Sequence, residues 1–175
     1  MNWNAFKNRG EILRDVSAVA DSRRDGALPL DVDGVRTAFA DELDLVGALQ
    51  LRWYTRLAGR IDRELMSQPL DLEQTVITAW RATADELPGV RAIVNRHRDH
   101  PLDDAMAEAM AVATAKEHTW LAVMAGLAGI SDGAAAAPVG AAIEEKARAG
   151  HRVTPARGVH AAPTLLDRLR TALVA

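Results

Sequence analysis

Residues 32–67, VDGVRTAFADELDLVGALQLRWYTRLAGRIDRELMS, decide the fold class of this chain. Apolar side chains recur there at steps of three and four, which is the spacing of one face of an α-helix. The stripe consists of Val35, Phe39, Leu43, Val46, Leu49, Trp53, Leu57, Ile61 and Leu65. Asp31 or Asp33 can cap the start of the segment, and Pro69 lies beyond its end. The pattern therefore predicts one unusually long helix.

The length of this helix raises a question about the shape of the molecule. A continuous helix over residues 32–67 is ~54 Å long at about 1.5 Å per residue. A compact chain of 175 residues has a diameter of only ~40 Å. Either the helix bends or breaks, or the molecule is elongated, or a partner covers the part of the helix that extends beyond the globule.

The remaining sequence carries the same helical signals. No segment alternates apolar and polar residues, so we expect no strand. Further helices are expected over residues 4–24, 71–87, 90–100, 102–127 and 138–149. Asp71 has the spacing of a capping box, and Pro88-Gly89 and His100-Pro101 interrupt the helical pattern. These signals predict an all-α bundle of four to five helices.

Composition limits the chemistry and the location of the protein. The chain is 49% hydrophobic and has no cysteine, which excludes a disulfide framework, a thiolate zinc site and a cysteine nucleophile. The longest apolar run, residues 120–130, is shorter than the roughly 20 residues that a bilayer span needs. The charged first twenty residues lack the pattern of a signal peptide. We therefore expect a cytoplasmic protein that does not contact a membrane.

Charge is distributed unevenly between the body and the C-terminal tail. Residues 1–145 have a net charge of −8 and residues 146–175 a net charge of +5, which together give the formal −3. We expect residues 1–150 to form a single all-α domain, followed by a basic linker and short helix over residues 151–175. Such a tail can bind nucleic acid or an acidic partner, or it can dock on its own acidic body or stay solvated. Because the tail has no aromatic residue, nucleic acid is not the expected partner.

The long helical segment has an acidic first half and a basic second half. The acidic residues are Asp31, Asp33, Asp41, Glu42 and Asp44, and the basic ones are Arg52, Arg56, Arg60 and Arg63. An antiparallel pairing with a second copy places each acidic half opposite a basic half, with Leu49 and Trp53 near the two-fold axis. This predicts a homodimer interface of Leu49, Arg52, Trp53, Arg56 and Arg60. Alternatively, the arginines form an ordinary solvent-exposed face of the helix, or they guide an acidic ligand along the helix.

Glu117 is an acidic residue on an apolar stripe, between Ala113 and Trp120. A carboxylate on a core face needs a partner, because an unpaired buried charge costs free energy. Together with His118 it can act as a general acid or base, or as a metal ligand. Alternatively, Glu117 pairs with an arginine of the 32–67 helix and holds the helix register, or it lies half exposed at the edge of the stripe.

Metal chemistry has only one further candidate. His97 and His100 form the one close histidine pair, but the pair lies in a polar run that resembles an exposed helix end. The Glu-x-x-His spacing of di-iron bundles is absent. We therefore expect no metal, no cofactor and no catalytic residue. The hypothesis is a non-enzymatic interaction or adaptor protein that self-associates and binds a protein partner, with a ligand- or metal-binding bundle as the alternative.

Overall fold

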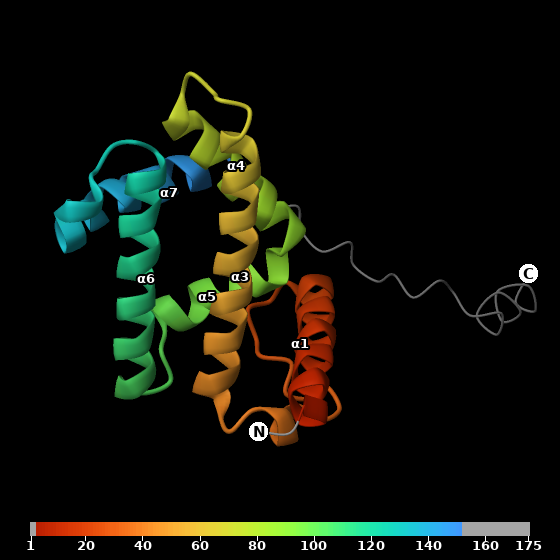
Figure 1. The fold of residues 1–175 in the computed structure, drawn as a ribbon. Helices are drawn as coiled ribbons and strands as arrows, with labels where there is room; N and C mark the ends of the chain where they lie inside the picture. Colours follow the sequence, from red (N-terminus) through yellow and green to blue (C-terminus); the bar gives the residue numbers. More distant parts are fainter. Residues whose placement is uncertain (1–2, 152–175) are drawn as a thin grey trace, which may run out of the picture.

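The computed structural model describes residues 3–151, with side chains from residue 8 onward, and the regular structure in this range is entirely helical (Figure 1). The predicted all-α class is confirmed. The elements are α1 (Trp3–Arg23), α2 (Val35–Ala38), α3 (Glu42–Leu65), α4 (Leu72–Glu86), α5 (Pro88–Asp99), α6 (Asp104–Met124), the 3-10 helix η1 (Ile130–Ala136) and α7 (Ala137–Ala149). No helix in the described range is long and apolar enough to cross a membrane.

The 32–67 segment breaks near its start, which answers the question of length. Helix α2 ends at Ala38, and Phe39 has extended backbone angles of φ −122° and ψ 132°. Helix α3 then begins after Asp41, whose side chain accepts a hydrogen bond of 2.7 Å from the backbone N–H of Asp44. With 24 residues, α3 is ~36 Å long and fits within a globule of this size.

Helix α3 is the central element of the bundle. It lies between α1 and α6, with α5 crossing behind it (Figure 1). Its inward side chains have no exposed surface: Leu45, Val46, Leu49, Trp53, Leu57 and Ile61. The core continues into α4, where the ring of Trp80 packs edge-on against Trp53 at a centroid distance of 5.6 Å. One side of α3 is thus committed to the core of its own chain.

Two glycines allow the close helix crossings that position the site. A Cβ atom on Gly89 of α5 would lie 1.9 Å from the carbonyl oxygen of Ala20 in α1. A Cβ atom on Gly140 of α7 would lie 1.7 Å from the carbonyl oxygen of His118 in α6. Because no side chain fits at either position, the backbones of these helix pairs touch directly.

The buried face of α6 differs from the predicted stripe. Met106, Met110, Glu117 and Leu121 are buried, whereas Leu102 and Leu127 at the ends of the predicted stripe are 57% and 50% exposed. The helix is capped by Asp103, whose carboxylate accepts from the N–H of Met106, and it ends at Met124. The stripe was extended too far because the apolar residues beyond Met124 belong to a turn.

Candidate functional site

Three charged side chains from three helices meet in the interior of the protein. Arg91 of α5, Glu117 of α6 and Glu144 of α7 each have a side-chain exposure of 5% or less. Arg91 Nη1 lies 3.1 Å from Glu117 Oε1, and Arg91 Nη2 donates to Glu144 Oε1. This buried ion cluster joins α5, α6 and α7 behind the central helix.

Arg91 is held between aromatic rings as well as carboxylates. Its guanidinium carbon lies 4.6 Å from the ring centroid of Trp53 and 5.1 Å from that of Trp80. Burial lowers the pKa of Arg91, and the charges of Glu117 and Glu144 oppose this effect. A buried cation of this kind persists because both carboxylates and the ring faces replace its hydration.

Glu117 is buried and paired, but its partner differs from the predicted one. The sequence pointed to an arginine of the 32–67 helix, and the structure places Arg91 of α5 there instead. Glu117 Oε1 also accepts a hydrogen bond of 3.0 Å from Trp53 Nε1, and Oε2 accepts one of 3.0 Å from Gln50 Nε2. Helix α3 therefore contributes neutral donors, and α5 contributes the charge.

Glu144 is the most heavily coordinated carboxylate of the cluster. In addition to Arg91, it accepts hydrogen bonds from Arg98, from Arg148 and from His118 Nε2, the last at 2.6 Å. Although burial raises the pKa of Glu144, the hydrogen bond from His118 and the three arginine charges hold it well below its ordinary value. The carboxylate is therefore strongly stabilised in its charged form.

Sequence reasoning missed Arg91 and Glu144, although Glu144 carries the signal that identified Glu117. It lies four residues after Gly140 and three before Ala147, both of which are buried on the same face of α7. Arg91 had no such signal, because the PGVRAIVNRHRD sequence of α5 is rich in arginine. Its role becomes apparent only when the helix crossings are known.

The cluster crosslinks helices but does not present a free acid or base. Both oxygens of Glu117 and of Glu144 already accept hydrogen bonds from protein donors. The two metal candidates were Glu117 with His118 and His97 with His100. Within residues 3–151, no group of three or more His, Asp or Glu side chains could hold a metal. His97 is buried and bonds the carbonyl oxygen of Ile93 through Nδ1, while His100 is exposed as the C-cap of α5.

The predicted interface residues on α3 divide into three groups. Leu49 and Trp53 are fully buried in the core of one chain, so they cannot lie on a two-fold axis between copies. Arg56 and Arg60 both pair with Glu86 of α4, at 2.5 Å and 2.6 Å. Arg52 alone stays without a hydrogen bond among the described residues, and its Nε atom is buried without a partner.

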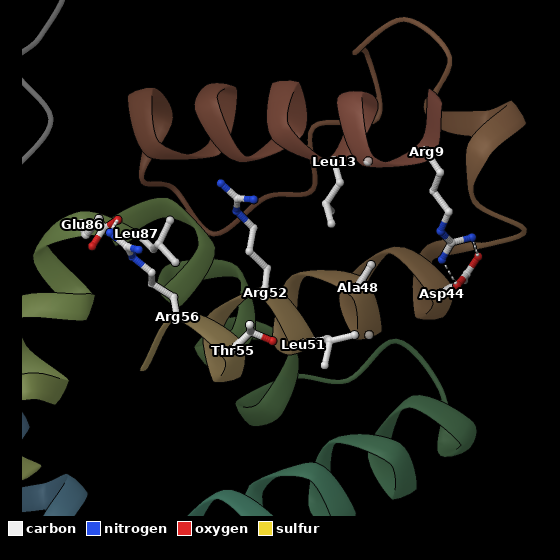
Figure 2. A pocket seen from close by; sticks show the side chains of 12 residues that line it. Arg9, Leu13, Asp44, Ala48, Leu51, Arg52, Thr55, Arg56, Glu86 and Leu87 are labelled. Carbon is white, nitrogen blue, oxygen red and sulfur yellow. Dashed lines mark hydrogen bonds and ion pairs between the residues drawn. The ribbon is translucent and has the colours of Figure 1, made fainter. Parts of the chain in front are cut away.

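A groove of about 900 Å³ runs between α1 and α3 on the side of α3 that faces away from the core (Figure 2). One end is closed by an ion pair between Arg9 and Asp44, at 2.6 Å. At the other end, the ion pair of Arg56 and Glu86 joins α3 to α4. The Arg52 side chain stands in the groove between these two ends.

Between the two ion pairs, the groove is lined by apolar residues and glycines together with Arg52 and Thr55. Leu13 of α1 points toward Ala48 of α3, Leu51 lies at the edge of the groove, and Leu87 lies beside Arg56 and Glu86 (Figure 2). Leu51 is 64% exposed, which is high for a leucine in the middle of a central helix. The groove thus combines an apolar surface with one cation that lacks a hydrogen-bond partner.

Two smaller hollows lie next to the ion cluster. One of about 410 Å³ between α3 and α6 reaches Glu117 and Gln50, whose Oε1 atom is buried without a partner. The other, of about 420 Å³, lies beside Arg98 and His118, and half of its lining residues are alanines. Both are less than half the volume of the α1–α3 groove.

No protein family, curated protein or solved structure matches this chain. The basic tail, for which the sequence allows binding to nucleic acid or an acidic partner, lies outside the described residues from residue 152 onward. Function is therefore inferred from the geometry of the groove and the cluster.

Proposed function

We propose that this protein acts by binding rather than by catalysis, and that the groove between α1 and α3 is its binding surface. The observation that carries the proposal is a pair of helix-interior glycines, Gly10 and Gly47, that line the groove. A Cβ atom at either position would meet no other atom within 4 Å. Each glycine destabilises its helix by about 1 kcal/mol relative to alanine. Since neither relieves a packing clash, their effect is to keep the groove open.

The state of the buried ion cluster supports a role without catalysis. A general acid or base has to exchange a proton with a substrate that it can reach. Glu117 and Glu144 are surrounded by protein donors, and His118 bonds Glu144 through Nε2. The cluster is better suited to a structural role than to proton transfer. It fixes the helices behind α3, so that the groove on the opposite side of α3 stays open.

The test compares two leucine substitutions on the same helix. Gly47→Leu fills the groove, whereas Gly59→Leu, at a position that also has open space around it, does not line the groove. Native mass spectrometry of the full chain purified from its own cells should show a bound species on the wild type and on Gly59→Leu, and its loss from Gly47→Leu. The proposal would be contradicted if the wild type, Gly47→Leu and Gly59→Leu carried the bound species equally, or if none of them carried a bound species.

Self-association is the second candidate function, and the exposure of Leu51 favours it. Leu51 and Thr55 are exposed on α3, so a second copy would contact these residues instead of Leu49 and Trp53. An antiparallel arrangement would place the acidic start of one α3 near the basic end of the other. Light scattering at micromolar concentration should give a dimer mass that Leu51→Glu reduces to a monomer. A monomer mass for the unmodified chain would exclude this candidate.

A further inference from the structure

We propose that the α1–α3 groove binds a small amphipathic carboxylate, with the carboxylate on Arg52 and the hydrocarbon chain along Leu13, Ala48 and Leu51. The inference rests on the proposed function, because it names the ligand class of the same groove. Three properties of the groove lead to it: a guanidinium without a hydrogen-bond partner, the apolar surface beside that group, and the ion pairs at the two ends.

The unmatched charge belongs to Arg52. The other two cations that line the groove are each paired, Arg9 with Asp44 and Arg56 with Glu86. Arg52 has no hydrogen bond among the described residues, and solvent does not reach its Nε atom. A guanidinium stays protonated at any physiological pH and presents a planar set of donors that matches a carboxylate. A ligand with one carboxylate would supply the acceptors that Arg52 lacks.

One protein carboxylate does act on Arg52 from a distance. Asp21 of α1 interacts electrostatically with Arg52, but its Oδ1 atom accepts the backbone N–H groups of Gly89 at 2.8 Å and Val90 at 3.4 Å. Asp21 is therefore engaged at the start of α5, and no hydrogen bond joins it to Arg52. The guanidinium remains available on the side that faces the groove (Figure 2).

The surface beside Arg52 suits a hydrocarbon chain. Leu13 points from α1 toward Ala48 of α3, and Leu51 lies one turn further along α3 at the edge of the groove (Figure 2). Gly10 and Gly47, which have no side chains, also line it. A chain that lay on this surface would cover Leu51, which is otherwise 64% exposed. The hydrophobic effect would then favour binding in proportion to the apolar area removed from water.

The ion pairs at the ends of the groove favour a small molecule over a helix of a partner protein. From Asp44 to Arg56 the groove spans ~18 Å along α3. The Arg9–Asp44 pair joins α1 to α3 at one end, and the Arg56–Glu86 pair joins α3 to α4 at the other. A partner helix would have to pass over or break these pairs. The volume of about 900 Å³ lies within the range of pockets that enclose small ligands, roughly 300 to 1,000 Å³.

The experiment is a calorimetric titration of the full chain with dodecanoate, below the concentration at which it forms micelles. Dodecanol, with the same chain and no charge, is the matched ligand. We expect the wild type to bind dodecanoate at least about tenfold more tightly than dodecanol, since hydrogen bonds to charged groups contribute on the order of 1.5–3 kcal/mol. Arg52→Gln should remove this preference and leave the affinity for dodecanol unchanged.

Gly47→Leu, which fills the groove, and its control Gly59→Leu separate this inference from the function on which it rests. Gly47→Leu should abolish binding of both ligands, and Gly59→Leu should bind both as the wild type does. Equal binding of dodecanoate by the wild type and Arg52→Gln would overturn the role of Arg52. If dodecanoate does not bind but Gly47→Leu still loses the species carried by the wild type, this inference fails and the proposed function stands. If Gly47→Leu changes neither the binding of dodecanoate nor the species carried by the wild type, both this inference and the proposed function fail.

Discussion

Replacement of Glu117 by alanine is the sharpest test of the buried ion cluster. The change removes the acceptor for three donors at once: Arg91 Nη1, Trp53 Nε1 and Gln50 Nε2. Arg91 keeps its second partner, Glu144, so it does not become an isolated charge. The Trp53 indole, which has no exposed surface, would keep an N–H without an acceptor.

The expected loss of stability follows from these contacts. Breaking a buried ion pair by removing one partner costs about 3–5 kcal/mol, and the remaining pair with Glu144 places this cluster near the lower end. An unsatisfied buried donor such as Trp53 Nε1 adds about 1–2 kcal/mol. The total is about 4 kcal/mol, which lowers the Tm by roughly 8–16 °C in a chain of this length. Glu117→Gln keeps an oxygen acceptor but not the charge, and should cost about 2 kcal/mol.

Urea and thermal unfolding followed by far-UV circular dichroism measure these differences. Glu108→Ala is the matched control, because Glu108 is an exposed glutamate on the same helix and should change stability by no more than about 0.5 kcal/mol. The expected order of stability is wild type and Glu108→Ala, then Glu117→Gln, then Glu117→Ala. A Glu117→Ala chain within about 1 kcal/mol of the wild type would refute a cluster that holds α3, α5 and α6 together.

Three further outcomes follow from the same contacts. Because the pKa of Glu144 is lower in the folded chain than in the unfolded chain, its contribution to stability is complete above about pH 5 and is lost as the pH falls through the acid range; Glu144→Gln should flatten that part of a stability–pH profile. Gly47→Ala should raise the free energy of unfolding by about 1 kcal/mol, because its Cβ meets open space. Gly140→Ala should lower that free energy by about 3 kcal/mol or more, because its Cβ would overlap the carbonyl oxygen of His118, and the same unfolding curves check both changes.

The helices could be predicted from the sequence because their signals are local. Asp71 and Asp103 cap α4 and α6, accepting from the N–H groups of Gln74 and Met106. The break before α3 was harder to locate, since Phe39 continues the apolar stripe and is itself buried. The local signal for the break is Asp41, an N-cap residue inside an apparently continuous stripe, which sequence reasoning missed.

Only part of the site could be predicted. The hydropathy pattern of a single helix indicates which of its residues are buried, but it does not indicate which residue of another helix forms an ion pair with them. Glu117 stood out on its apolar stripe, but the choice of Arg91 as its partner depends on how α5 crosses α6. The arginine row of α3 shows the converse case. Its spacing suggested a partner outside the chain, whereas Glu86 of α4 pairs with Arg56 and Arg60. A row of like charges on one helix therefore says little until the facing helix is known.

The ion cluster and the groove are related through their positions on opposite sides of α3. Trp53 and Gln50 reach back from α3 to Glu117, while Leu51 and Arg52, which lie between them in sequence, face the groove. Hydrogen bonds to Glu117 fix the rotation of α3 about its own axis, and this rotation determines that Arg52 stands in the groove. A variant that loosens the cluster should therefore weaken binding at Arg52, even though no cluster residue lines the groove. Because Glu117→Gln is expected to cost less stability than Glu117→Ala, titration of Glu117→Gln with dodecanoate measures this coupling.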